Sequence, residues 1–130
     1  MVSKEHRFHG YNKLTTVYRK GQTSRTSLLS LKYYKNSRRT TYRLAVVVSR
    51  KVHKSAVVRN RIRRRIFELY RLNAPQFADQ YDMIVTVFSE QIADTPATDL
   101  RNMVEKQLQQ AGIVGPKTAA QHRKTSNDVV

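Results

Sequence analysis

Arginine side chains are concentrated in one stretch of the sequence, SRKVHKSAVVRNRIRRRIFELYR, which spans residues 49–71. A guanidinium is a planar fork of donors that suits phosphate oxygens and also stacks on exposed bases. At roughly 100° per residue, apolar side chains fall on one side of this stretch: Val58, Ile62, Ile66 and Leu69. The other side is almost purely guanidinium. The spacing therefore predicts an amphipathic helix whose polar face suits phosphate.

A run of like charges is most often a solvated helix face, and that interpretation is the first alternative. Repulsion between arginines four residues apart, such as Arg59 and Arg63, costs a few tenths of a kcal/mol per pair, and within the stretch Glu68 alone relieves it. A bound polyanion would turn that cost into a gain. A membrane surface is the second alternative. Because the apolar face of the helix is aliphatic and narrow, we favour nucleic acid.

The composition also favours a polyanionic partner. The chain has 130 residues, a hydrophobic content of 39% and a formal net charge of +16, and this length suits one globular domain with its own core. A charge of this size exceeds what solubility requires. The sequence has no cysteine, and its first residues, MVSKEHRFHG, lack the apolar run of a signal peptide. We expect a single soluble, cytoplasmic domain.

The charge is unevenly distributed along the chain. Residues 1–41 carry ten basic side chains and one acidic side chain, and residues 42–72 also carry ten and one. Residues 73–112 reverse the balance, with two basic and six acidic side chains, and the remaining residues carry three and one. We therefore expect one strongly positive face or end, supported by the less charged segment.

Periodicity and helix-ending residues predict the order of the elements. A short helix is expected between Asn12, as its cap, and Gly21. Strands are expected at residues 27–34, 42–50 and 81–88, which alternate or are β-branched and apolar. The basic helix should cover residues 55–72, and a last helix should run from Pro96 to Gly112. This order predicts an α+β fold in which helices cover a small sheet of about four strands.

The domain boundary follows from composition. Residues 113–130 have little apolar content, so we expect a disordered tail there. Residues 1–112 then form one α+β domain, which we expect to bind nucleic acid.

Side chains that could form the active site of a metal-dependent nuclease are sparse in this sequence. The acidic residues of the C-terminal part show no cluster spaced for a two-metal site; they are Asp79, Asp82, Glu90, Asp94, Asp99 and Glu105. His6 and His9 form an H-x-x-H pair, but no cysteine or nearby acid completes a metal shell. We interpret both as surface or RNA-facing histidines and expect no catalytic site on the protein.

The stretch AVVRNRIRRRIFELYR, preceded by SRKV and by RLAVVV, resembles the signature region of the bacterial ribonuclease P protein subunit. Its RNR triplet, Arg59-Asn60-Arg61, is the most recognisable feature of that family. The segment HRFHGYNKLTTVYRKG is similar to the family's N-terminal pattern, and YDMIVTV resembles the strand that follows the basic helix. The resemblance covers about residues 6–112.

The resemblance implies a compact α+β fold shared with a ribosomal small-subunit protein domain, with a left-handed βαβ crossover around the basic helix. Handedness statistics alone predict a right-handed crossover, so here we follow the resemblance. It also implies that the basic helix and the preceding loop face a catalytic RNA subunit. The matching positions are Arg50, Lys51, Lys54, Arg59, Asn60, Arg61, Arg63 and Arg64.

The same resemblance implies a cleft, between the first helix and the sheet, for the single-stranded 5′ leader of precursor tRNA. Aromatic faces over a basic groove suit single strands because stacking contributes about 1–3 kcal/mol per base. The matching positions are Leu14, Tyr18, Tyr33, Tyr34 and Arg43. Leu14 stands where the family commonly has phenylalanine, and Phe88 where relatives often have a basic residue. For each tyrosine, core packing is as good an interpretation as a leader contact.

The function implied by the resemblance is that of the protein component of ribonuclease P, the endonuclease that removes the 5′ leader of precursor tRNA. Hydrolysis would be carried by the RNA subunit and its Mg²⁺, and the protein would bind no metal tightly. Its partners would be the RNA subunit and precursor tRNA, with no membrane and no small-molecule substrate. Charge and helix alone equally permit a ribosomal or general RNA-binding protein of the same fold. A stand-alone metal-dependent nuclease is the third hypothesis.

Overall fold

The computed structural model describes residues 6, 8, 11–36, 38 and 40–115, and the side chains of residues 11–13 are outside that description. Along the chain the elements are α1 (Tyr11–Lys20), β1 (Gln22–Arg25), β2 (Leu29–Lys35), β3 (Arg43–Val47), α2 (Ala56–Asn73), η2 (Ala74–Gln76), β4 (Tyr81–Val87), η3 (Glu90–Ala93) and α3 (Ala97–Ala111). Every predicted helix and strand is present, and the α+β fold class is confirmed.

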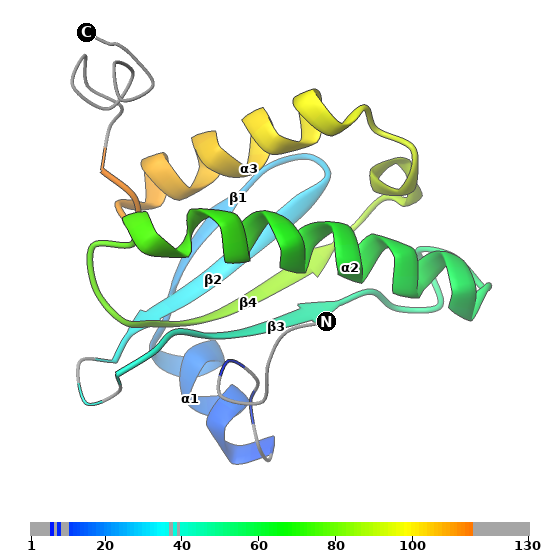
Figure 1. The fold of residues 1–130 in the computed structure, drawn as a ribbon. Helices are drawn as coiled ribbons and strands as arrows, with labels where there is room; N and C mark the ends of the chain where they lie inside the picture. The colour runs from blue at the N-terminus through cyan, green and yellow to red at the C-terminus, as the bar shows by residue number, and fades with distance from the viewer. Residues whose placement is uncertain (1–5, 7, 9–10, 37, 39, 116–130) are drawn as a thin grey trace, which may run out of the picture.

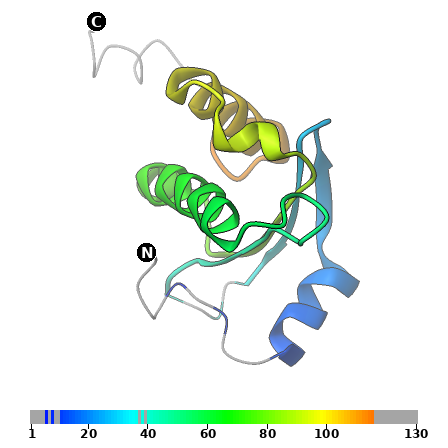
Figure 2. The same ribbon diagram turned by 90° about the vertical axis from the view of Figure 1, so that its right-hand side faces the viewer.

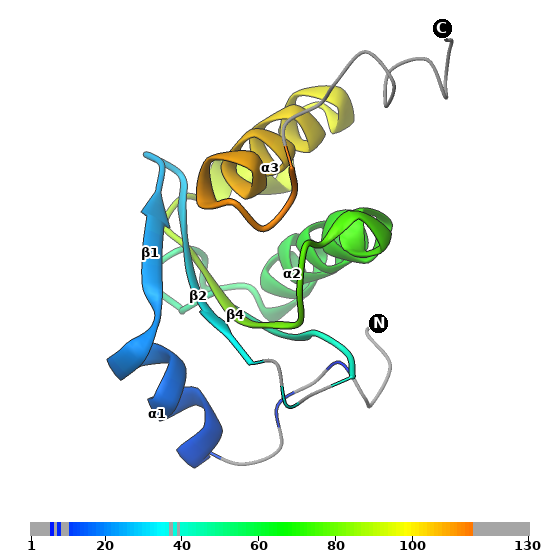
Figure 3. The ribbon, with the colours of Figure 1, turned by 90° about the vertical axis from the view of Figure 1, so that its left-hand side faces the viewer.

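The elements form layers around one four-stranded sheet, whose strand order is β1-β2-β4-β3. β2 pairs antiparallel with both β1 and β4, whereas β3 pairs parallel with β4. Figure 2 and Figure 3 show α2 and α3 on one face of the sheet and α1 on the other. The two faces therefore differ: one is covered by two helices, and the other carries a single short helix.

The parallel pair is joined by a left-handed crossover. In Figure 1 the chain runs along β3 to the right, returns to the left along α2 in front of the sheet, and enters β4 above β3. Parallel connections are right-handed in nearly all known cases. The hand implied by the family resemblance is thus confirmed, and general statistics would have given the wrong one.

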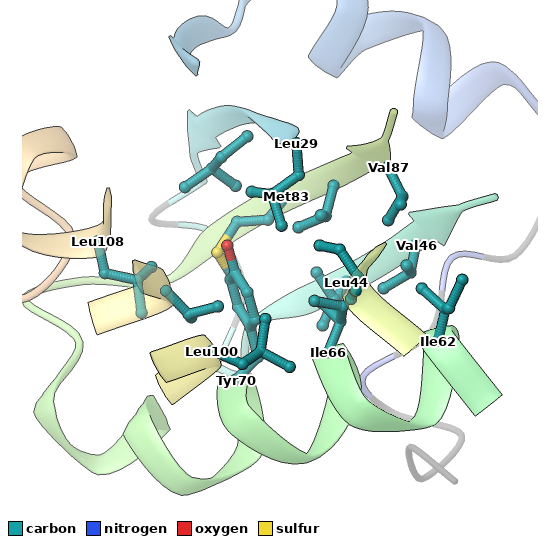
Figure 4. Packing of buried hydrophobic residues seen from close by; sticks show 14 of the residues in the cluster. Leu29, Leu44, Val46, Ile62, Ile66, Tyr70, Met83, Val87, Leu100 and Leu108 are labelled. Carbon is teal, nitrogen blue, oxygen red and sulfur yellow. The ribbon is translucent and has the colours of Figure 1, made fainter. Parts of the chain in front are cut away.

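The main core lies between the sheet and the two helices α2 and α3. Strand residues such as Leu44, Met83 and Val87 meet Ile66 of α2 and Leu108 of α3 there (Figure 4). The predicted apolar stripe of α2 is confirmed, with Ile62 and Ile66 fully buried and Val58 and Leu69 packed against the cluster. Tyr70, also fully buried, extends that stripe. On the opposite face, Val17 of α1 and Ile84 of β4 are both 0% exposed.

The predicted domain boundary is wrong by two residues. Ile113 and Val114, expected in a disordered tail, are buried in the core, and Val114 forms a β-bridge with Phe77. The amide of Ala78 donates to the carbonyl of Ile113 at 2.7 Å. The segment after α3 therefore packs on the core through these two apolar side chains. The remainder of the predicted tail, from residue 116, lies outside the described residues.

Two local predictions about the N-terminal elements also need correction. Asn12 lies inside α1 and does not cap it, since the helix begins at Tyr11. β1 was not predicted, because its sequence QTSR is polar and short. Gly21, as predicted, follows the last residue of α1, and its amide donates to the carbonyl of Val17 at 2.8 Å.

Candidate nucleic-acid interface

The start of α2 is held by its own first arginine. Ser55 caps the helix, with its hydroxyl accepting from the amide of Val58 at 3.4 Å. The guanidinium of Arg59 donates to the carbonyls of His53 and Lys54 at 3.0 and 2.9 Å. The first arginine of the RNR triplet thus fixes the loop that leads into the helix.

The asparagine of the RNR triplet orients another arginine. Arg63 donates to Oδ1 of Asn60 at 2.6 Å and to the carbonyl of Val48 at 3.3 Å. This pair of bonds connects the first turns of α2 to the end of β3. Arg59 and Arg63 are both half-buried, so their main contribution in the free protein is to shape the segment between β3 and α2.

Arg65 has a role that the sequence did not reveal. Its guanidinium donates to the carbonyls of Ile92, Ala93 and Thr95 at 2.5, 3.0 and 2.5 Å. These carbonyls belong to η3 and the turn before α3. Arg65 therefore joins α2 to the segment that leads into α3. No sequence signal marks it, because its acceptors are main-chain groups distant along the chain.

The remaining cations at this end of α2 are exposed. Arg61 approaches Asp94 at 3.4 Å, and their side chains are 56% and 83% exposed, so this ion pair contributes little. Within the described part of the chain, Arg64 makes no side-chain hydrogen bond or ion pair. The exposed polar residues of the preceding loop and first turns form what we call the α2 arginine surface: Arg50, Lys51, Lys54, Asn60, Arg61 and Arg64.

A basic hollow lies beside α1, at the end of β2. Its volume is about 380 Å³, and it is lined by Thr16, Lys20, Tyr34, Lys35, Asn36 and Arg38. We call it the α1 groove. Lys35 bonds Asp79 at 3.0 Å, and this carboxylate raises the pKa of Lys35, which keeps the ammonium charged. The groove combines an aromatic ring with several cations.

Leu14 and Tyr18, which match the positions of the family's aromatic pair on α1, do not line the groove. Tyr18 is 48% exposed, Leu14 is half-buried, and Val17 between them is the residue that packs on the sheet. Neither Leu14 nor Tyr18 is among the residues that line the hollow. Tyr18 is nevertheless an exposed aromatic ring on the same helix as Lys20.

Tyr33 and Tyr34 lie on opposite faces of the sheet, because successive strand residues alternate. Tyr33 pairs with Met83, packs against the main core, and donates from its hydroxyl to Gln22 Oε1 at 3.1 Å. Its ring also meets Tyr81 edge-on at 6.3 Å. The pleat thus turns only Tyr34 towards the face that carries α1. Both tyrosines nevertheless line a second hollow of about 350 Å³ at the end of β2, together with Lys20 and Lys35.

Arg43 does not face the α1 groove as a free cation. It is 6% exposed and binds both carboxylate oxygens of Asp82, at 2.8 and 2.6 Å. Asn36 donates to the same carboxylate at 3.0 Å, and the ring of Phe8 lies 4.8 Å from the guanidinium carbon of Arg43. The fork of donors is used inside the protein. The predicted leader contact of Arg43 is therefore disfavoured by its burial, and in the structure Arg43 forms a buried ion pair with Asp82.

The described histidines and carboxylates form no metal site. No three His, Cys, Asp or Glu side chains in the described part of the chain are close enough to hold a metal ion. His6 stacks on Tyr42 at 4.1 Å, while His9 lies outside the described residues. None of the described helices has the length and apolar character needed to cross a membrane.

The known proteins that this chain resembles belong to one family. The family model described as Ribonuclease P matches residues 2–112. The ribonuclease P protein component of Roseiflexus castenholzii is 39% identical over 75% of this chain and 79% of its own length. The ribonuclease P protein component of Clostridium novyi is 34% identical over 86% of this chain and 98% of its own length.

Solved structures share the fold. The RNase P protein of Staphylococcus aureus has a TM-score of 0.74 at 24% identity, covering 85% of this chain and 98% of its own. The RNase P protein of Thermotoga maritima has a TM-score of 0.70 at 20% identity, and the match covers 80% of this chain and 96% of that protein.

Proposed function

The chain belongs to the bacterial ribonuclease P protein family, and from this premise we propose that its two basic surfaces bind two different RNAs. As a ribonuclease P protein component, it is an RNA-binding protein of tRNA processing and forms part of the holoenzyme. The α2 arginine surface binds the RNA subunit. The α1 groove binds the single-stranded 5′ leader of precursor tRNA.

The α2 arginine surface is supported by its charge and by its rigid base. Arg61 and Arg64 are exposed on the helix, and Lys51 and Lys54 are exposed in the loop before it. Arg59 and Arg63 hold this loop and the end of β3 in place through main-chain carbonyls. A surface that is ordered before binding loses less conformational entropy when RNA arrives. The proposal rests on this set of exposed cations at the start of α2, where arginine–carbonyl hydrogen bonds fix the backbone.

The α1 groove is supported by the combination of Tyr34 with Lys20, Lys35 and Arg38. Stacking on a ring needs no particular base, and cations around it contact the backbone of the strand. A leader of variable sequence requires this kind of recognition. Tyr18, exposed on α1, offers a second ring next to the groove.

Catalysis is assigned to the RNA subunit. The described carboxylates and histidines of the protein form no group that fits Mg²⁺, so no catalytic step is placed on them. The hydrolysis and the Mg²⁺ that it requires belong to the RNA in this proposal. The protein contributes leader binding and positive charge that screens phosphate repulsion.

One assay tests the proposal. The purified protein is added to a ribonuclease P RNA and a precursor tRNA at low Mg²⁺ concentration, and cleavage of the 5′ leader is followed. We expect faster cleavage with both subunits and none with the protein alone. A general RNA-binding protein of the same fold would bind RNA without stimulating cleavage, which would contradict the proposal. Cleavage by the protein alone would contradict the assignment of catalysis.

A further inference from the structure

An aromatic ring and a guanidinium lie exposed together at the end of the sheet opposite the α1 groove. Phe88, the residue after β4, is 40% exposed, and the guanidinium carbon of Arg25 lies 4.7 Å from the centre of its ring. The amide of Phe88 donates to the carbonyl of Leu28 at 2.8 Å, which fixes the backbone beneath the ring. Arg25 thus lies over the ring, and Phe88 keeps part of its surface exposed.

Strand register places this pair on the sheet face that carries α1. Residues paired directly across strands share a face, and one row crosses all four strands: Arg25, Ser30, Thr86 and Val47. Alternation along β4 puts Phe88 on the same side as Thr86, in agreement with its contact with Arg25. Tyr34 pairs with Asp82 and lies on this face as well.

The floor beside Phe88 is open. Ser30 and Thr86 are small and half-buried, and Val47 is 39% exposed. Figure 2 and Figure 3 show α1 over one end of this face and, within the described chain, no helix over the other. A partly apolar floor with an aromatic ring and a cation at its edge is therefore partly exposed.

The position of Phe88 connects the two proposed RNA surfaces. It lies six residues along β4 from Asp82, the partner of Tyr34, which is roughly 20 Å of extended strand. The neighbouring β3 ends at Val47 and leads directly into the loop that carries Arg50 and Lys51. The open floor thus extends from the α1 groove towards the α2 arginine surface.

We propose that Phe88, backed by Arg25, is a stacking platform for one base of the single-stranded leader, at the end of the sheet face next to the α2 arginine surface. This inference rests on the proposed function and adds a residue that determines how the leader is held. Single-stranded RNA is the occupant that fits, because a partly exposed ring can stack on any base and Arg25 supplies a cation for its phosphate. The leader would then run from this platform across the floor to the α1 groove.

The test combines variants with altered leaders in the reconstituted holoenzyme. Affinity is measured for precursor tRNAs that carry one abasic nucleotide at successive leader positions, and for mature tRNA. We expect Phe88→Ala to weaken binding of the intact precursor by roughly tenfold and to leave mature tRNA unaffected. On a precursor that is abasic at the position stacked by Phe88, the variant should cause no further loss. Phe88→Tyr should retain binding.

Two further variants separate the proposal from effects on folding. Phe88→Leu keeps apolar volume but removes the ring face, so it should lose affinity as Phe88→Ala does while retaining the thermal unfolding midpoint. Leu72→Ala, an exposed apolar residue of α2 that is 55% accessible, should change neither affinity. If Phe88→Leu binds all substrates normally, the platform does not exist.

Other outcomes distinguish this inference from the function on which it rests. Equal losses for precursor and mature tRNA would mean that Phe88 contacts the RNA subunit or the tRNA body, and would overturn the platform. A leader-specific loss in Tyr18→Ala without one in Phe88→Leu would overturn the platform and leave the leader surface in place. If neither substitution changes the affinity for precursor tRNA relative to that for mature tRNA, the leader-binding function itself fails.

Discussion

At the scale of single residues, the five arginines between positions 59 and 65 of α2 fall into two groups that look alike in the sequence. Arg59, Arg63 and Arg65 donate to main-chain carbonyls, whereas Arg61 and Arg64 are exposed. Periodicity predicts the polar face correctly because it depends on positions within one helix. The carbonyl partners come from β3, the loop before α2 and the segment before α3, so the helix sequence alone carries no sign of them.

An exposed arginine should act on RNA affinity and not on folding. We expect Arg64→Ala to weaken binding of the RNA subunit and to make the slope of log affinity against log salt shallower by about one. The free energy of unfolding should change by less than about 0.5 kcal/mol. Affinity titrations at several salt concentrations measure the slope. Arg101→Ala, which removes an exposed charge from α3, is the matched control, and an equal change in both variants would contradict the assignment.

A bridging arginine should show the reverse behaviour. Arg65→Ala leaves the carbonyls of Ile92, Ala93 and Thr95 without their donor, and we expect a loss of about 2–3 kcal/mol in the free energy of unfolding. Urea denaturation measures this loss. The salt dependence of RNA binding should be unchanged. A shallower slope with unaltered stability would make Arg65 an RNA ligand instead.

At the scale of elements, β2 places its two tyrosines in different surroundings. The strand was predicted from its alternation, and the same alternation requires Tyr33 and Tyr34 to lie on opposite faces. The family resemblance grouped them because it compares positions and not directions. The structure places Tyr34 in the α1 groove and Tyr33 against the main core.

The two tyrosines should therefore differ when each is replaced. Tyr34→Ala should reduce the preference for precursor over mature tRNA by about 1–3 kcal/mol while preserving stability. Tyr33→Ala should mainly lower the free energy of unfolding, because it removes a ring packed on the core and on Tyr81. Affinity ratios and urea denaturation of both variants provide the comparison. The opposite pattern would place the leader on the other face of the sheet.

β1 exists because the chain turns back immediately after α1. A Cβ on Gly21 would lie 2.4 Å from the carbonyl oxygen of Val17 and 2.9 Å from that of Tyr33. The backbones of α1 and β2 thus approach so closely that the connecting residue has no room for a side chain. The polar sequence of β1 gave no strand signal, since its place depends on this connection and on backbone pairing with β2.

Replacement of Gly21 tests that close approach. We expect Gly21→Ala to cost about 1–3 kcal/mol of unfolding free energy, because both obstructing atoms are main-chain oxygens that cannot rotate away. Gly115→Ala is the control, since a Cβ there would meet nothing within 4 Å. Thermal or urea unfolding of the two variants measures the difference. Equal stabilities would show that α1 can shift away from β2 at little cost.

At the scale of the whole molecule, the charge distribution and the hand of the crossover differ in how far the sequence predicts them. The uneven charge follows from simple counting, from which one strongly positive face or end was expected. Cations line the α1 groove on one side of the sheet and the α2 arginine surface on the other. The left-handed crossover could be predicted only through the family resemblance, because general strand-twist arguments favour the opposite hand.

The separation of the two surfaces predicts different responses to salt. Binding of the RNA subunit depends on phosphate contacts, and if about six are made, log affinity should fall with log salt at a slope of roughly −4 to −5. The preference for precursor over mature tRNA depends on stacking and on the few cations of the α1 groove, so it should vary less with salt. Affinities for the RNA subunit and for both tRNA forms, measured over one salt series, test this. A preference for precursor that falls as steeply as RNA-subunit binding would mean that cations, and not aromatic rings, hold the leader.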